Sequence, residues 1–157
     1  MNPHYKAFLD LTGWSEGTST SLLTKNNGYD VIVTGVDGPS IFTDYSDHPF
    51  MLGGGIIVRK SPLLISSASG RYQLLARYWR VYKEQLNLYD FTPNSQDAVA
   101  LQQMRERGAL PLLDAGNVEG AITQCSNIWA SLPGNSYGQG GGKSMEALLE
   151  KYQVLLG

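Results

Sequence analysis

The sequence is poor in the residues that carry most thiol and metal chemistry. Among its 157 residues there is one cysteine, Cys125, and there are two histidines, His4 and His48. A single cysteine can form neither an internal disulfide nor a thiolate metal cluster, and two histidines argue against a histidine-rich catalytic metal site. We therefore expect a protein that needs no metal and no cofactor.

Charge and long apolar runs are also scarce. The 12 basic and 14 acidic residues leave a net charge of −2, which gives no electrostatic reason to expect nucleic acid or an anionic membrane as a partner. The longest apolar run, "MLGGGIIV", is too short and too rich in glycine to span a bilayer, and no secretory signal is evident. We expect a monomer without stable membrane association that is made in the cytoplasm.

Two common catalytic motifs are missing. There is no G-x-S-x-G element, and His48 precedes Pro49 in a stretch typical of a loop, which argues against a serine hydrolase. The segment "GQGGGKS", residues 138 to 144, comes nearest to a phosphate-binding loop but lacks its first glycine, because position 137 is tyrosine. Nucleotide binding is therefore not expected.

The elements that are present predict an α+β protein. The stretch "YDVIVTGVDGPSIFTDY" is typical of a hairpin, and "MLGGGIIVRK" predicts a further strand, so residues 27–60 should form a small β-hairpin subdomain. The rest is predicted helical, and the length fits one domain spanning 1–157. The expected helices run from Pro3 to Glu16, over 69–88, from 94 or 95 to about 107, over 117–132 with Asn117 as cap, and over 144–156 with Ser144 as cap. Residues 109–116 are expected to form a short helical turn or a single turn of 3₁₀ helix.

Glu16 lies where a carboxylate is unfavourable. Asn2 and Pro3 predict a helix start, and Gly17 predicts its end, so Glu16 falls in the last turn beside the negative end of the helix dipole. Residue 12, one turn back, is a threonine and offers no positive charge. Both features favour a protonated carboxyl group, as a general acid requires, although a solvated surface glutamate is the plainer interpretation.

Other carboxylates lie in the β region. Asp30, Asp37, Asp44 and Asp47 could place a second acidic group in a cleft with Glu16, which is the arrangement of many glycoside hydrolases. Aspartates in hairpin turns usually bond their own backbone, and we assign that role to Asp37. Asp44 and Asp47, on either side of Tyr45, stay open as catalytic partners.

Aromatic residues provide a second sign of sugar binding. Tyr45, Tyr72 and Tyr137 lie outside strong core stripes or next to glycine, where a flat ring could stack on a sugar face. Trp79, Tyr82 and Trp129 are expected in the core. Gly70 would allow close backbone approach, and Gln73, expected in the first turn of the longest helix, would offer a donor and an acceptor to a ligand amide.

Taken in order, several segments resemble the lambda-type phage endolysins. They are "KAFLDLTGWSEGT", "NNGYDVIV", "FTDYSDHP", "SGRYQLLARYW", "FTPNSQDAVALQQMRERGALPLL" and "CSNIWASLPGNSYGQ", which extend from about residue 6 to residue 140. The family consists of peptidoglycan lytic transglycosylases with a lysozyme-like fold. The resemblance therefore implies a mainly helical domain in which the β-hairpin subdomain forms one side of a cleft.

The same resemblance implies roles for single residues. The family's catalytic glutamate in its W-S-E-G element corresponds to Glu16, and the G-x-x-Q element that contacts the sugar N-acetyl group is similar to Gly70 through Gln73. Tyr137 matches a cleft tyrosine, and Tyr45 lies in the hairpin lip. The implied partner is the peptidoglycan glycan strand, reached from the host cytoplasm once a separate protein permeabilises the membrane.

Alternative functions and two departures from the family pattern stay open. A true hydrolase would use Glu16 with Asp44 or Asp47, a sugar-binding module would use the same cleft without chemistry, and a purely structural phage protein is a more remote alternative. Residues 50–65 are more apolar and richer in glycine than expected at the lip, where basic residues are common. The tail after residue 140 matches the family poorly and is expected only to pack.

Overall fold

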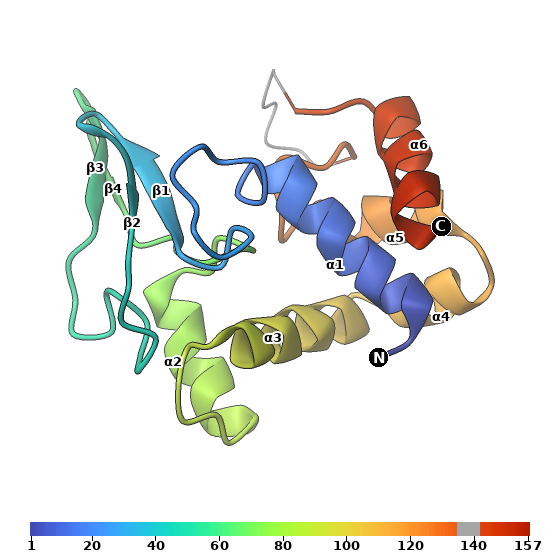
Figure 1. Ribbon diagram of the computed structural model, residues 1–157, viewed down its shortest axis with the longest axis horizontal. Helices are drawn as coiled ribbons and strands as arrows, with labels where there is room; N and C mark the ends of the chain where they lie inside the picture. Colours follow the sequence, from blue (N-terminus) through green and yellow to red (C-terminus); the bar gives the residue numbers. More distant parts are fainter. Residues whose placement is uncertain (135–141) are drawn as a thin grey trace. The chain divides into compact units, whose positions relative to one another are not determined.

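The computed structural model describes residues 1–134 and 142–157, and Figure 1 labels its helices and strands. These residues form two compact units, one made of Met1–Glu16 with Ala100–Gly157 and the other of Gly17–Val99. Whether they act as one domain, as the chain length suggests, stays a prediction. Within the described residues, no helix combines the length and the apolarity that crossing a membrane would require.

The first unit begins with α1, Pro3–Glu16, which packs against α6, Met145–Leu156. Asn2 Oδ1 accepts a hydrogen bond from the backbone N–H of His4 at 2.8 Å, and the helix ends before Gly17, whose φ is +80°. The predicted bounds of this helix are therefore confirmed. Phe8, Leu9 and Leu11 are fully buried and hold α1 in the unit.

Two more of the described helices lie wholly in this unit. Gly108, with φ +73°, precedes α4, Ala109–Asp114, and the Asn117 side chain caps α5, Val118–Cys125, by accepting from the N–H of Gly120 at 2.9 Å. Ser144 caps α6 as predicted, accepting from the N–H of Ala147 at 3.1 Å. α5 ends at Cys125, earlier than the predicted 132. The core of the unit contains, among others, Leu113, Ala121, Ile122, Trp129, Leu148 and Tyr152.

The second unit holds two antiparallel hairpins (Figure 1). β1, Val31–Gly35, pairs with β2, Gly38–Ile41, as predicted. β3, Ile56–Lys60, pairs with β4, Leu63–Ser66, a strand that sequence reasoning missed, so the β region extends beyond residue 60. The turn at Ser61 and Pro62 carries none of the Asn-Gly or Asp-Gly signals on which a hairpin prediction depends.

The predicted helix over 69–88 is wrong in its first third. α2 spans only Ala76–Gln85, and Ser69 instead pairs with Leu74 across a tight turn. Gly70 and Gln73 have φ values of +84° and +52°, which helical residues do not adopt. The turn is stabilised from outside, because the Gln96 side chain accepts from the N–H of Arg71 at 2.9 Å. Local periodicity could not reveal a partner so distant in sequence.

Among the described residues, the remaining helix is α3, Pro93–Glu106, which starts at Pro93 itself and belongs partly to each unit. Proline is well suited to a first helical position, where its missing N–H costs nothing, so the prediction of a start at 94 or 95 was slightly late. The core of the second unit gathers residues from both hairpin and helical segments: Ile32, Phe42, Leu74, Trp79, Phe91 and Val99.

Candidate active site

Glu16 is the last residue of α1 and is only partly exposed. Burial raises the pKa of its carboxyl group from 4.5 to about 7, against a smaller opposing effect of the Lys143 ammonium group. The sequence predicted a raised pKa from the helix dipole, whereas the structure assigns it mainly to desolvation. A carboxyl group with a pKa near 7 can both give up and take back a proton near neutral pH, which suits general acid–base chemistry.

Contacts within the first unit fix the end of α1 around Glu16. Ser15 Oγ lies 2.9 Å from Ser131 Oγ, and Lys143 Nζ donates to the carbonyl oxygen of Ser15 at 3.4 Å. Lys143 also lies 4.6 Å from the centre of the Trp14 ring, and Lys151 lies 5.3 Å from the same centre. Sequence reasoning missed Lys143 because nothing local marks a residue 127 positions away as a neighbour of Glu16.

Asp47 links separate segments of the second unit through hydrogen bonds. Its carboxylate accepts from Trp79 Nε1 at 2.7 Å and from Lys83 Nζ at 3.0 Å. Burial alone would raise the pKa of Asp47, but these hydrogen bonds and the one from the N–H of His48 outweigh it, and the pKa is lowered. Asp47 therefore resembles a structural carboxylate more than a poised catalytic base.

Three further aspartates also have turn or loop positions. Asp44 is exposed, and its hydrogen bonds with Ser46 lower its pKa. Asp30 is buried and accepts from Thr24 Oγ1 and, at 2.9 Å, from the N–H of Lys25. Asp37 lies, as predicted, in the turn between β1 and β2. Asp44 and Asp30 are thus engaged in local structure.

Two of the three tyrosines considered for sugar stacking can be placed. The Tyr45 ring is partly buried 5.1 Å from the Phe42 ring centre, and its hydroxyl accepts from Asn26 Nδ2 at 3.1 Å. Tyr72 is only 5% exposed and donates to Asp97 Oδ1 at 2.6 Å, so its expected position outside the core is wrong. Tyr137 lies outside the described residues.

Gln73 occupies the tight turn before α2 and not the first turn of a helix. Its Nε2 donates to the carbonyl oxygens of Gly70, at 2.9 Å, and Val31, at 3.3 Å. Both amide hydrogens are therefore used inside the fold, which orients the side chain and leaves the amide oxygen as the group suited to a ligand donor. Gly70 itself is required by Gln96, because an added Cβ would lie 2.4 Å from Gln96 Oε1.

A second group of polar residues was not predicted. Tyr29 and Tyr72 both donate to Asp97 Oδ1, at 2.9 and 2.6 Å, and the Arg71 guanidinium lies 5.2 Å from the Tyr29 ring centre. These residues come from three separate segments, so no local motif announces them. Over residues 1–134 and 142–157, no group of three or more His, Cys, Asp or Glu side chains is placed to hold a metal ion.

Comparison with solved structures defines the class of protein. The structure titled bacteriophage lambda lysozyme complexed with a chitohexasaccharide matches with a TM-score of 0.87 and 52% identity, over 100% of this chain and 96% of that one. A second structure, lysozyme from bacteriophage lambda, matches with a TM-score of 0.77 and 48% identity, over 99% and 91%. The fold is therefore the lysozyme-like α+β fold, as expected.

Comparison with known sequences then gives the family. A family model described as Endolysin matches residues 6–157. The endolysin of Escherichia phage lambda is 54% identical over 154 residues, covering 98% of this chain and 91% of its own length. The endolysin of Escherichia phage P2 is 59% identical over 142 residues, covering 88% and 86%. This chain belongs to the endolysin family, and the family match includes the tail that the resemblance left out.

Proposed function

We propose that this chain degrades bacterial peptidoglycan during host lysis, as a lytic transglycosylase that uses Glu16 as its acid and base. The observation that carries the proposal is the Glu16 carboxyl group, which lies at the end of α1 with its pKa raised by burial to about 7. At that pKa a substantial fraction of the carboxyl groups is protonated at neutral pH, as the first chemical step requires.

The proposed reaction needs no water. The Glu16 carboxyl group protonates the oxygen that links N-acetylmuramic acid C1 to N-acetylglucosamine O4, the bond breaks, and the glucosamine side leaves with a free 4-hydroxyl. The Glu16 carboxylate then removes the proton from the muramic acid 6-hydroxyl, whose oxygen attacks C1 of the same sugar. The product is a 1,6-anhydro ring, and Glu16 is protonated again. Tethering of the nucleophile to the reacting sugar supplies the orientation that a bound water would otherwise need.

The carboxylates of the β region support a mechanism with one carboxyl group. Asp47 is held by Trp79 and Lys83, and Asp44 by Ser46, and the pKa of each is lowered. These contacts within the fold account for an acidic residue at each of the two positions without a catalytic role. This favours the transglycosylase over the hydrolase in which Asp44 or Asp47 would activate water.

The proposed binding residues serve the sugar chain. Gln73, with Nε2 held by two carbonyl groups, presents its amide oxygen to the N–H of an N-acetyl group. Tyr45 and Tyr137 provide ring faces for sugar stacking. That a solved relative at 52% identity is complexed with a chitohexasaccharide supports binding of a glycan strand here. We further propose that the protein reaches the cell wall from the host cytoplasm after another protein permeabilises the membrane.

The test is to digest purified peptidoglycan and to weigh the released muropeptides by mass spectrometry. Transglycosylation predicts products one water lighter than hydrolysis products, without a reducing muramic end. Reducing-end products would refute the transglycosylase and support a hydrolase. Binding to peptidoglycan without any release would support a sugar-binding module.

Variants assign the residues. Glu16→Gln should abolish release under either mechanism, so it tests the site and not the reaction type. Asp44→Asn and Asp47→Asn separate the mechanisms, because both should retain cleavage if one carboxyl group suffices. Loss of cleavage in a folded Asp44→Asn or Asp47→Asn protein would point to a second catalytic carboxylate.

A further inference from the structure

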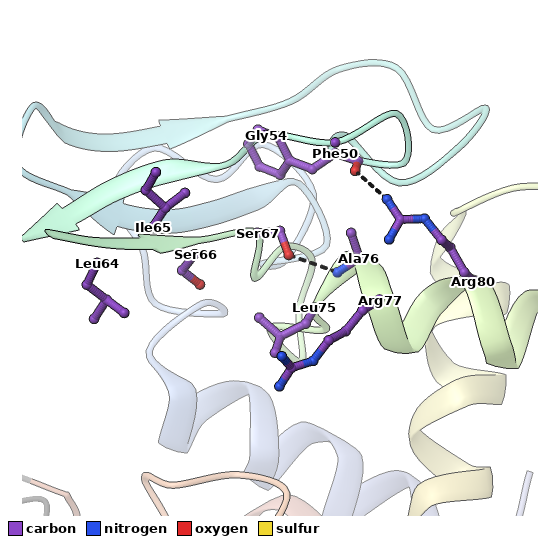
Figure 2. A pocket seen from close by; sticks show the side chains of 11 residues that line it. Phe50, Gly54, Leu64, Ile65, Ser66, Ser67, Leu75, Ala76, Arg77 and Arg80 are labelled. Carbon is purple, nitrogen blue, oxygen red and sulfur yellow. Dashed lines mark hydrogen bonds between the residues drawn. The ribbon is translucent and has the colours of Figure 1, made fainter.

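A pocket of about 500 Å³ lies within the second unit, between the end of the β3–β4 hairpin and the start of α2 (Figure 2). Its size is in the range of sites that take a small ligand or a few residues of a peptide. Sequence reasoning did not predict it, because β4 was missed and α2 was expected to begin earlier. The lining residues are Phe50, Gly53, Gly54, Leu64, Ile65, Ser66, Ser67, Leu75, Ala76, Arg77 and Arg80.

The hairpin contributes exposed apolar side chains to this pocket. Leu64 and Ile65, on β4, are 43% and 52% exposed, so part of their apolar surface is open to a ligand. Leu75 adds a further apolar side chain where α2 begins, as Figure 2 shows. These side chains offer contact to small apolar groups of a ligand.

The helix contributes positive charge. Arg77 and Arg80 are one turn apart on α2, and none of the eleven lining residues is acidic. Arg80 Nη2 donates to the carbonyl oxygen of Met51 at 2.8 Å, which anchors that side chain beside the pocket. Arg77 lies over the Tyr78 ring at 4.9 Å.

Arg77 and Arg80 keep hydrogen-bond donors that the fold does not use. In the part of the chain that the structure describes, no carboxylate forms a salt bridge with Arg77 or Arg80. A guanidinium group has five N–H donors, and the bonds to Met51, Phe50 and Tyr78 occupy only some of them. An anionic ligand would therefore find donors ready for bidentate bonds.

We propose that this pocket binds the stem peptide of peptidoglycan through one of its carboxylates. The inference rests on the proposed function, which makes peptidoglycan the substrate. The stem peptide joins free carboxylates to small alanine side chains, which matches a pocket lined by two arginines and by aliphatic side chains. Its concave form suits a short peptide better than a flat membrane surface. The pocket would thus distinguish peptide-bearing glycan from bare glycan.

The first measurement is direct binding of the free tripeptide L-alanyl-γ-D-glutamyl-meso-diaminopimelate to the protein. Calorimetry and NMR chemical-shift changes measure this binding. Because one charge-assisted hydrogen bond pair is lost, we expect Arg77→Gln to weaken binding by about tenfold or more. Arg107→Gln removes the same charge at an exposed residue outside the pocket and should leave binding unchanged. Arg80→Lys keeps the charge but loses bidentate geometry and should give an intermediate affinity.

A second pair of variants tests charge at one position. Leu64→Glu places a carboxylate in the pocket wall and should abolish tripeptide binding, whereas Leu64→Lys should preserve or strengthen it. Both changes remove the same exposed leucine, so a difference between them reports charge and not lost apolar contact. Circular dichroism confirms that each variant is folded. Equal affinities for the two Leu64 variants would overturn the proposal.

Other outcomes are equally decisive. No binding of the tripeptide to wild-type protein, or binding unaffected by Arg77→Gln and Leu64→Glu, would refute the stem-peptide site. Charge-dependent binding to phosphatidylglycerol vesicles with no binding of the tripeptide would assign the pocket to a membrane surface instead. Tripeptide binding to Glu16→Gln is measured in parallel and should be retained. Because binding needs no catalysis, failure of the lytic reaction and failure of this pocket remain distinguishable.

Discussion

Glu16 shows how one carboxyl group can link stability to pH. Its pKa of about 7 in the folded chain exceeds the value near 4.5 of an exposed glutamate, so the folded state binds the proton more tightly. The folded protein loses this advantage as the pH rises from about 4.5 through 7, because the buried carboxylate must then ionise. The contribution of Glu16 to the free energy of unfolding should therefore be less favourable above neutral pH than at pH 4.5.

The first prediction is that Glu16→Gln removes this loss. Between pH 4.5 and pH 8, the free energy of unfolding of wild-type protein should fall by about 2 to 3 kcal/mol more than that of the variant. Urea denaturation at both pH values measures the difference. Glu146→Gln, at an exposed residue of α6, is the control and should show the wild-type pH dependence. Identical pH dependence in Glu16→Gln would mean that Glu16 titrates like a solvated residue.

Lys143 provides the second prediction, because its ammonium group lowers the pKa of Glu16 against the effect of burial. Lys143→Met should raise that pKa and move the alkaline limit of activity to higher pH, while Lys143→Arg should keep the wild-type profile. Rates of peptidoglycan release between pH 5 and 9 measure the shift. Lys151→Met is a matched control, since Lys151 also contacts the Trp14 ring. A shift of similar size in both methionine variants would assign the effect to Trp14.

Among the secondary-structure elements, the turn that precedes α2 is determined by contacts from distant residues. Gly70 adopts a left-handed conformation and approaches the Gln96 side chain so closely that only glycine fits. Gln96 also donates to the carbonyl oxygens of Tyr29 and Phe91, which fixes its position. The turn that orients Gln73 therefore depends on α3 as much as on its own sequence.

The third prediction separates backbone strain from steric contact. Gly108→Ala has the same left-handed strain with open space around the new Cβ, and should cost about 1 kcal/mol. Gly70→Ala adds the clash with Gln96 and should cost about 3 kcal/mol. Thermal or urea unfolding of both variants measures the two free energies. Equal costs would mean that Gln96 moves away without loss.

For the protein as a whole, α3 is the element that the two compact units share. The first unit is also discontinuous in sequence, since α1 packs against α6 from the other end of the chain. Unfolding of either unit would shorten a helix on which the other depends. Helix formation is cooperative, so we expect one transition and not two.

The fourth prediction uses Cys125 to follow this transition. Burial raises the pKa of the Cys125 thiol to about 12, so a thiol reagent at pH 8 should label native protein very slowly. Labelling should become fast at the urea concentration where α2, in the other unit, loses hydrogen-exchange protection. Mass spectrometry reads both quantities in one sample. Thiol exposure at a clearly lower urea concentration would show that the first unit opens by itself.

Many helix ends could be predicted from the sequence, because they depend on interactions between neighbouring residues. Asn2, Gly17, Asn117 and Ser144 mark helix ends through their own hydrogen bonds or backbone conformation, and each prediction is confirmed. The W-S-E-G element also identified Glu16 as the candidate acid. Its catalytic role, like the binding roles of Tyr45, Gln73 and Tyr137, stays a prediction.

Tertiary contacts decided the rest. The strand β4, the late start of α2 and the hydrogen bonds that hold Gln73 depend on partners such as Gln96 and Val31, which no window of neighbouring residues contains. The raised pKa of Glu16, the influence of Lys143 on it and the structural engagement of Asp47 likewise follow from burial and long-range approach. Amino-acid order alone fixes helix ends and turn residues, because these need only their neighbours. Burial and charge at a site depend on which distant segments meet there, and folding alone determines that.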